Sequence, residues 1–174
     1  IQVMALCDYE RDRAERCQEY LRKASMPAAD IYSGEDGYKE LCKRKDIDLV
    51  YIAPDWKHHF LVAYEAMNNG KHVAVEVPAA MNLTEIWKLI DISEKKRLHC
   101  MMLENCCYDF FELNSLNMAQ KDVFGEILYV QGAYRHELSK FWDAYWKKDA
   151  QDKLGWRLDY NQKFRGDVYA THGL

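Results

Sequence analysis

The sequence lacks several features that would assign it to a particular class of protein. No apolar run reaches the roughly 18 residues that a membrane-spanning helix needs, so we expect no membrane span. The formal net charge is −4, which gives no general attraction to nucleic acid or to an anionic membrane. None of the six cysteines forms a C-x-x-C pair or has histidine at ligand spacing, so we predict reduced, buried thiols and no metal site.

A glycine-rich phosphate-binding turn is also missing, because none of the eight glycines belongs to a G-x-G-x-x-G pattern. Dinucleotide-binding folds place an acidic residue about 20 residues beyond such a turn, at the end of the second strand. Asp8 ends the apolar segment "IQVMALCD" and fits that acidic residue. By itself Asp8 is weak support for this interpretation, since an acid at a strand end is more often a helix cap.

What is present is an alternation of apolar strands with amphipathic helices. The predicted strands cover residues 1–8, 46–54, 71–78 and 98–105, and the predicted helices cover residues 9–24, 58–70, 83–97 and 113–125. Asn69-Gly70 ends the second of these helices, and Asn82 with Glu85 forms a capping box for the third. Strands that alternate with helices of 10–15 residues indicate a parallel sheet with right-handed crossovers.

The pattern changes after Gly125. Residues 126–138, "EILYVQGAYRHEL", alternate with period two, which predicts a half-exposed antiparallel strand. We therefore place a domain boundary near residue 123. The predicted fold class is α/β: residues 1–123 form a Rossmann-type parallel sheet whose first strand and Gly-rich turn are absent, and residues 124–174 begin an α+β substrate-binding domain with an open antiparallel sheet. We expect both domains to be incomplete in this chain.

Polar residues follow all four predicted strands. Asp8 ends the first, residues 54–59 (Pro-Asp-Trp-Lys-His-His) follow the second, Glu76-Val77-Pro78 follows the third, and Glu104-Asn105 ends the fourth. Ligands bind beyond the carboxyl ends of the strands of an open parallel sheet. Each residue alone fits a cap or a solvated side chain, but the four groups together favour a binding site.

A second group of polar and aromatic residues lies in the last third of the chain. Its members are Tyr134, His136, Trp156, Arg157, Tyr160, Tyr169, Thr171 and His172. Aromatic faces combined with arginine and histidine suit a sugar, which needs stacking surfaces and hydrogen-bond donors. For Phe141, Trp142 and Trp146 we prefer the interpretation of an aromatic core.

These motifs resemble those of the Gfo/Idh/MocA oxidoreductase family. The strings that carry the resemblance are "ALCD", "DIDLVYIAPDWKHH", "GKHVAVEVPAA" and "GEILYVQGAY". The family implies a Rossmann domain followed by a substrate domain on an open antiparallel sheet. Many of its dehydrogenases have Glu-Lys-Pro after the third strand, where the lysine helps hydride and proton transfer. This chain has Glu76-Val77-Pro78, which argues against an ordinary sugar dehydrogenase.

Longer strings are similar to glycoside hydrolase family 109, among them "MMLENCCY", "WRLDYN" and "YATHGL". The match is loose over residues 138–155, and Ala170 stands where we expect proline. The resemblance implies NAD as cofactor and assigns to its binding Asp8, Trp56, Lys57, His58, His59, Glu76, Val77 and Asn105. It assigns to sugar binding Tyr134, Arg157, Tyr169, Ala170, Thr171 and His172, with His172 or Tyr169 as the catalytic group that transfers protons.

The implied activity is that of an NAD-dependent α-N-acetylgalactosaminidase acting on a small-molecule glycoside. NAD⁺ takes a hydride from carbon 3 of the sugar, a base removes the proton from carbon 2, the glycosidic oxygen leaves, water adds and the hydride returns. The alternatives are an NAD-dependent sugar or cyclitol dehydrogenase, and a non-catalytic regulator that senses NAD and sugar. We expect a homo-oligomer, and the sequence does not decide between a cytoplasmic and an exported protein.

Overall fold

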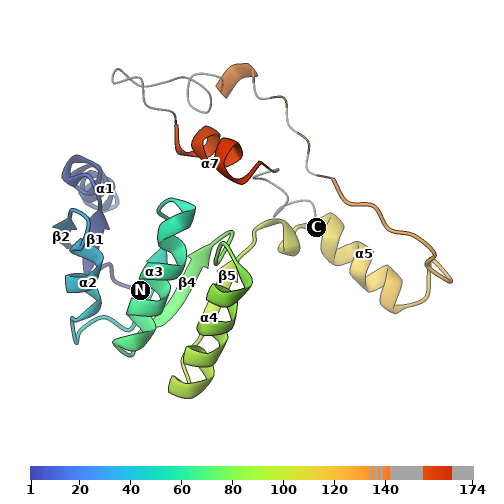
Figure 1. Cartoon of the computed structure of the whole chain (residues 1–174), viewed down its shortest axis with the longest axis horizontal. Helices are drawn as coiled ribbons and strands as arrows, with labels where there is room; N and C mark the ends of the chain where they lie inside the picture. The colour runs from blue at the N-terminus through green and yellow to red at the C-terminus, as the bar shows by residue number, and fades with distance from the viewer. Residues whose placement is uncertain (134, 136, 138, 142–154, 166–174) are drawn as a thin grey trace. The chain divides into compact units, whose positions relative to one another are not determined.

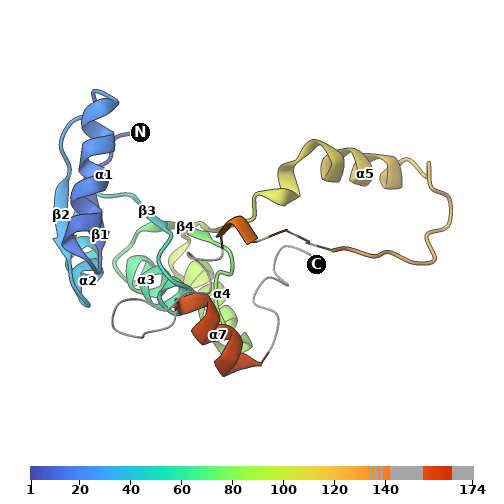
Figure 2. The ribbon, with the colours of Figure 1, turned by 90° about the horizontal axis from the view of Figure 1, so that it is seen from above.

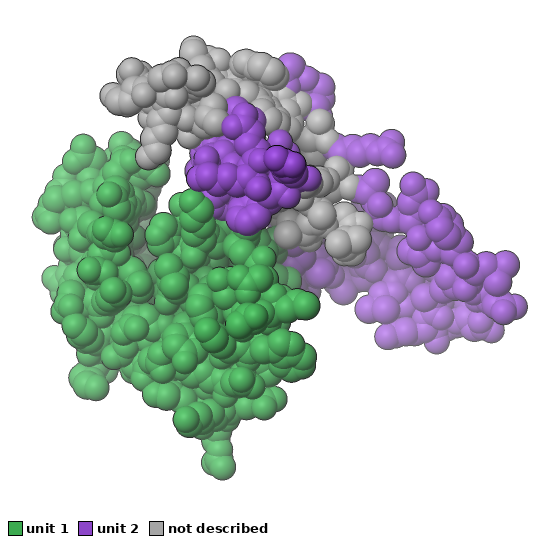
Figure 3. Space-filling view, in the orientation of Figure 1, with its two compact units in different colours: residues 1–103 green, residues 104–174 purple. Residues whose placement is uncertain are grey.

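The structure is a computed structural model that describes residues 1–133, 135, 137, 139–141 and 155–165 (Figure 1). The chain divides into two compact units, Ile1–Leu103 and Glu104–Leu174, which are coloured separately in Figure 3. No helix in the described ranges is both long enough and apolar enough to cross a membrane. Each unit is described by itself.

The first unit contains two parallel sheets. Strand β1 (Ala5–Asp8) pairs with β2 (Asp30–Ser33). The other sheet has the order β3-β4-β5, formed by Leu49–Ile52, His72–Glu76 and Cys100–Leu103. All three pairings are parallel, so the predicted Rossmann-type parallel sheet is confirmed.

The order of the strands explains why there are two sheets. The usual dinucleotide-binding fold has the strand order 3-2-1-4-5-6. Here β2-β1 corresponds to positions 3-2, and β3-β4-β5 corresponds to positions 4-5-6. Among the described residues, no strand occupies the position that this order places between β1 and β3.

Four helices connect the strands of the first unit. They are α1 (Arg11–Lys23), α2 (Gly37–Cys42), α3 (Trp56–Asn68) and α4 (Leu83–Lys96). Figure 2 shows α1 beside β1 and β2. The Asn82 side chain accepts a hydrogen bond from the backbone N–H of Glu85 at 3.0 Å, and the Glu85 carboxylate accepts one from the N–H of Met81 at 2.9 Å. The predicted capping box at the start of α4 is therefore formed, with its return bond one residue earlier than usual.

The sequence did not predict β2 or α2, because both elements are short and depend on packing. Strand β2 has four residues and α2 has six. Gly37, Leu41 and Cys42 of α2 are buried. A Cβ atom on Gly37 would lie 3.2 Å from the Cys7 sulfur, so the absence of a side chain lets α2 approach β1 closely.

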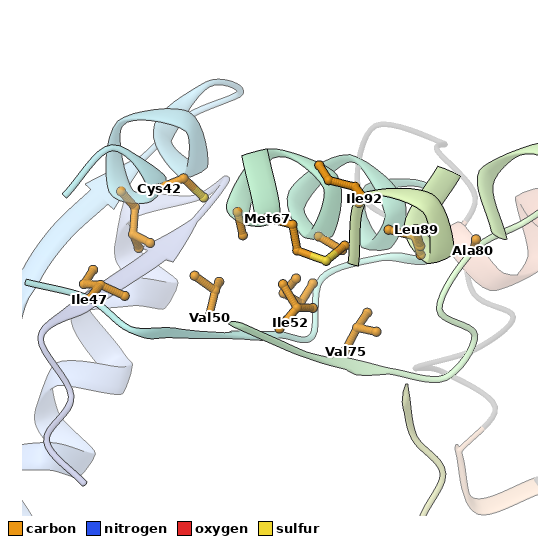
Figure 4. Close-up of a cluster of buried hydrophobic side chains, with 13 residues drawn as sticks. Cys42, Ile47, Val50, Ile52, Met67, Val75, Ala80, Leu89 and Ile92 are labelled. Carbon is orange, nitrogen blue, oxygen red and sulfur yellow. The ribbon is translucent and has the colours of Figure 1, made fainter. Parts of the chain in front are cut away.

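The core lies between one face of β3-β4-β5 and the helices α3 and α4. Val50, Ile52 and Val75 point from the strands toward Met67 of α3 and toward α4 (Figure 4). Full burial of a side chain of this kind contributes about 1.5–3 kcal/mol relative to exposure. The same layer also contains the following buried residues: Ala63, Ala66, Val73, Leu89 and Ile92. The core thus holds β3 and β4 side by side, with their carboxyl ends at one edge.

The cysteines only partly match the prediction of buried thiols. All six are free, but Cys7, Cys17 and Cys107 are exposed, so the predicted burial is wrong for these three. In α1 only Ala14 is buried, because the two strands beneath that helix are too few to cover the rest of its apolar face. Burial raises the pKa of the Cys42 thiol to about 12, so this thiol stays protonated and unreactive at neutral pH.

The second unit contains short helical elements and extended segments. They are η1 (Cys106–Tyr108), α5 (Phe110–Gln120), η2 (Ser139–Phe141) and α7 (Trp156–Phe164). No strand is formed over the described residues 126–133, where an antiparallel strand was predicted. A strand needs a hydrogen-bonding neighbour, and Leu128, Tyr129 and Val130 remain exposed without one in this part of the chain. Trp142 and Trp146 lie outside the described residues. The predicted assignment of residues 104–123 to the NAD-binding domain stays a prediction.

Candidate functional site

Asp8 is the last residue of β1 and lies at the carboxyl edge of its sheet. Its Oδ1 accepts a hydrogen bond from the backbone N–H of Glu10 at 2.9 Å. Within the described part of the chain, its Oδ2 accepts no hydrogen bond. The first oxygen fixes the turn into α1, and the second is available to a ligand, as a ribose-binding carboxylate requires.

The two arginines that follow Asp8 are already paired. Nε of Arg11 lies 2.9 Å from Oε1 of Glu15, and Nε of Arg13 lies 3.1 Å from Oε2 of Glu10. A 2′-phosphate needs a free cation beside the ribose, whereas a 2′-hydroxyl needs an acceptor. The end of β1 therefore fits the adenosine half of NAD better than that of NADP.

The loop after β3 carries a helix cap and a contact between a carboxylate and a histidine ring. Asp55 is the N-cap of α3, and its side chain accepts a hydrogen bond from the backbone N–H of His58 at 3.3 Å. The same Asp55 oxygen also contacts Nδ1 of His58. Trp56 begins α3 and is buried, and Lys57 follows on an exposed position. The predicted cofactor segment is thus the first turn of α3.

His59 differs from the residues around it because its side chain is inside the protein. It is 1% exposed. Its Nδ1 lies 2.6 Å from the carbonyl oxygen of Pro78, and its Nε2 lies 3.2 Å from the carbonyl oxygen of Pro54. The ring therefore bridges the loops that follow β3 and β4.

Glu76 ends β4 and is bonded to a residue that the sequence did not indicate. The hydroxyl of Tyr51 on β3 donates a hydrogen bond to the Glu76 carboxylate. This bond raises the pKa of Tyr51, and partial burial adds to the effect. Tyr51 and Glu76 share a face because Tyr51 pairs with Ala74, two residues before Glu76. The period-two pattern of "LVYI" places Tyr51 on one face, but the pairing register is needed to find its partner.

The remaining predicted residues belong to the second unit. Asn105 precedes η1, and its backbone oxygen accepts a hydrogen bond from the N–H of Tyr108 at 3.3 Å. Arg157 lies in α7 with its guanidinium 4.1 Å from the ring centroid of Trp156. This is a cation–π arrangement. Tyr134, His136, Tyr169, Ala170, Thr171 and His172 lie outside the described residues.

Taken together, the first unit brings the predicted cofactor residues to the carboxyl ends of its parallel strands. Asp55, His58 and His59 follow β3, Glu76 and Val77 follow β4, and Asp8 ends β1 on the other sheet. This fits a dinucleotide, which needs hydroxyl acceptors along such an edge. No group of three or more His, Cys, Asp or Glu side chains that could hold a metal ion occurs among the residues whose placement is described.

Two sequence profiles match successive parts of the chain. Residues 1–104 match the oxidoreductase family with an NAD-binding Rossmann fold, and residues 108–174 match the C-terminal domain of glycosyl hydrolase 109. Glycosyl hydrolase family 109 protein 5 of Phocaeicola vulgatus is 71% identical over 99% of this chain and 33% of its own length. Glycosyl hydrolase family 109 protein 1 of Bacteroides thetaiotaomicron is 60% identical over 99% of this chain and 36% of its own length. The chain spans about a third of the length of these curated relatives.

Solved structures share the fold. A myo-inositol 2-dehydrogenase from Lactobacillus plantarum has a TM-score of 0.62 and 18% identity, over 74% of this chain and 36% of that one. A 3-ketoreductase from Actinomadura kijaniata, solved with NADP and TDP-benzene, has a TM-score of 0.60 and 24% identity, over 72% of this chain and 36% of that one. At this identity the likeness establishes the Rossmann-type architecture alone.

Proposed function

This chain belongs to the Gfo/Idh/MocA oxidoreductase family with its NAD-binding Rossmann fold, and from that premise we propose that the whole protein is an NAD-dependent glycosidase. We further propose that its substrates are α-linked N-acetylgalactosaminides. The observation that carries the proposal is the continuity of an NAD-binding edge ending in Glu76-Val77-Pro78 with a glycosyl hydrolase 109 domain sequence from residue 108 onward. Relatives that are 60–71% identical over this whole chain, and that are named as members of glycosyl hydrolase family 109, support it.

The residues at the strand ends hold and orient the cofactor. Bound NAD⁺ supplies a reversible hydride acceptor, which activates the neighbouring carbon of the sugar toward elimination. Asp8 accepts hydrogen bonds from the adenosine ribose through its available oxygen. Glu76, oriented by Tyr51, lines the nicotinamide side together with Lys57 and His58 of the first turn of α3. Asn105 completes the set of proposed cofactor contacts.

Val77 bears on which group moves protons. A valine side chain carries no titratable group, so it cannot act as the lysine of Glu-Lys-Pro does in dehydrogenases of the family. We assign proton transfer to His172 or Tyr169, since an imidazole changes its protonation near neutral pH. We assign sugar binding to Tyr134, Arg157, Ala170 and Thr171. Arg157 lies over the ring of Trp156, so a planar cation and an aromatic face, two groups that suit sugar recognition, occur side by side in α7.

Isotope incorporation tests the reaction class. The intact protein, purified with its bound nucleotide, is incubated in D₂O with an α-linked N-acetylgalactosaminide. Because carbon 2 loses its proton before the glycosidic bond breaks, the released sugar should carry deuterium at carbon 2, without net formation of NADH.

The other possible outcomes contradict the proposal in separate ways. Hydrolysis with hydrogen retained at carbon 2 indicates direct displacement. Stoichiometric reduction of added NAD⁺ by a free sugar or cyclitol indicates a dehydrogenase. Binding of NAD and sugar without any product indicates a non-catalytic regulator. The homo-oligomeric state stays a separate prediction, which light scattering of the intact protein checks.

A further inference from the structure

The side chain of His59 is buried, and each of its ring nitrogens lies close to a backbone oxygen of a different loop. It lies in the first turn of α3, and its ring is almost wholly enclosed. Both of its ring nitrogens face backbone oxygens, at 2.6 Å and 3.2 Å. A buried polar side chain is normally satisfied by such partners. The two oxygens belong to different loops, that of Pro54 after β3 and that of Pro78 after β4.

The two carbonyl groups lie beyond the ends of two neighbouring strands. Strand β3 ends at Ile52 and β4 ends at Glu76, so Pro54 and Pro78 each lie two residues past a strand end. The last pair of the β3–β4 ladder is Ile52 with Val75. Past that pair the ladder no longer fixes the spacing of the two loops. The ring of His59 contacts the backbone of both loops.

The number of donors on the ring limits how it can bind. A neutral imidazole donates one N–H, and an imidazolium donates two. At 2.6 Å, Nδ1 is well placed to donate to Pro78, and an imidazolium can also donate to Pro54 through Nε2. In the described part of the chain both nitrogens are thus directed at backbone oxygens, and neither is directed out of the protein.

We propose that His59 is a positioning residue that ties the loop after β3 to the loop after β4 and thereby sets the nicotinamide half of the NAD site. It acts through the loops and does not touch the cofactor. Asp55 and His58 lie on one side of this bridge, and Glu76 and Val77 lie on the other. The proposal rests on NAD binding by the first unit and does not depend on the reaction that the whole protein catalyses.

The location of the bridge gives a discriminating test. Asp8, which we assign to the adenosine ribose, lies at the end of β1 on the other sheet. Loss of the bridge should therefore weaken binding of the nicotinamide half and spare the adenosine half. A general loss of structure would weaken both halves equally.

The experiment compares the intact protein with His59→Phe, which keeps an aromatic ring but has no donor, and with His59→Gln, whose amide keeps a donor. His99→Phe is the matched control, because His99 is exposed and precedes β5 at the opposite end of the strands. Dissociation constants for NAD⁺ and for AMP are measured by calorimetry, well below the lowest melting temperature. AMP reports the adenosine half alone.

For His59→Phe we expect the dissociation constant for NAD⁺ to rise about 10- to 100-fold and that for AMP to change less than twofold. His59→Gln should give a smaller loss, and His99→Phe should match the unaltered protein for both ligands. If the phenylalanine variant does not fold, the glutamine variant carries the same comparison. Equal weakening of NAD⁺ and AMP would overturn the proposal, and so would unchanged NAD⁺ binding.

Discussion

The two ends of the parallel strands use charged residues in opposite ways. At the amino ends, the guanidinium of Arg44 binds two carboxylates. Its Nη1 lies 2.6 Å from Oδ2 of Asp30 at the start of β2, and its Nη2 lies 2.6 Å from Oδ2 of Asp46 before β3. Buried Lys71, before β4, donates to the backbone oxygen of Arg44. Every charge in this group has a partner within the chain.

At the carboxyl ends the carboxylates keep capacity for a ligand. Among the described residues, Oδ1 of Asp8 accepts a hydrogen bond from its own turn and Oδ2 accepts none, while the Glu76 carboxylate accepts one from Tyr51. Charges that are satisfied internally contribute to stability, whereas charges with unused acceptors are suited to recognition. The comparison implies that substitutions at one end change melting temperature, and that substitutions at the other end change nucleotide affinity.

Among the charged residues at the two ends of the strands, Asp8 at the carboxyl end is expected to give the largest effect, in Asp8→Asn. A neutral amide accepts more weakly from ribose hydroxyls, since hydrogen bonds to charged groups are worth about 1.5–3 kcal/mol. The dissociation constant for NAD⁺ should rise about 10-fold or more, and the preference for NAD⁺ over NADP⁺ should shrink. Calorimetry measures both constants. An unchanged preference would show that Asp8 is only the cap of its turn.

Next in size is Arg44→Met at the amino end, which removes the link between β2 and the segment before β3. The melting temperature should fall because both ion pairs of Arg44 are lost. The fall should be limited to about 5 °C, since the partners Asp30 and Asp46 are partly solvated. NAD⁺ affinity measured below the transition should not change. Arg11→Met, in an exposed pair with Glu15, serves as control and should shift melting by less. A loss of NAD⁺ affinity in Arg44→Met would contradict the assignment of stability to the amino ends and of nucleotide binding to the carboxyl ends.

A third prediction concerns acid. The hydrogen bond from Arg44 lowers the pKa of Asp46 to about 2, below its ordinary value of 3.8. Because the folded pKa is the lower one, this pair stabilises the fold above about pH 4, and the contribution is lost as pH falls toward 2. Asp46→Asn should therefore lower the melting temperature at pH 6 but have little effect near pH 2. Scanning calorimetry of both proteins at several pH values checks this, and an equal difference at every pH would contradict it.

A smaller change is expected for Tyr51→Phe. The variant loses only the hydroxyl that orients Glu76, and the tyrosine is 61% exposed. NAD⁺ affinity should fall about two- to fivefold, within the usual range for one hydrogen bond. In Glu76→Gln the same tyrosine substitution should have a reduced effect, because its partner is altered. Strictly additive effects in this double-mutant cycle would mean that the pair does not act together.

The smallest effect is expected for Val77→Lys. In the proposed glycosidase reaction the cofactor is recycled by the rest of the site, so on that proposal the lysine alone should not create an efficient dehydrogenase. Reduction of free NAD⁺ by sugars, followed at 340 nm, should remain near the level of the unaltered protein. Rates typical of the family's dehydrogenases would show that Val77 decides the reaction type.

Local sequence signals predicted the strand ends and the helix caps well. Asp8, Glu76 and the Asn82–Glu85 box depend on a few neighbouring residues, and alternation of strands and helices indicates parallel pairing. Strand β2 and helix α2 were missed because their short segments become ordered through packing against β1.

The partners of the site residues depend on spacing that the sequence does not contain. The Tyr51–Glu76 contact follows from the register of β3 on β4. The environment of His59 follows from the positions of two loops that are 24 residues apart at Pro54 and Pro78. Sequence alone placed His59 beside the cofactor, whereas the structure encloses its ring between backbone oxygens.

Hydrogen–deuterium exchange of the intact protein, with and without NAD⁺, tests the central claim that the carboxyl ends of these strands form the cofactor site. NAD⁺ should slow exchange in peptides that cover Asp8, the first turn of α3 and Glu76. Peptides that cover Asp30, Arg44–Asp46 and Lys71 should exchange at the same rate in both states. Protection confined to the amino ends, or no protection at either end despite bound NAD⁺, would contradict the account.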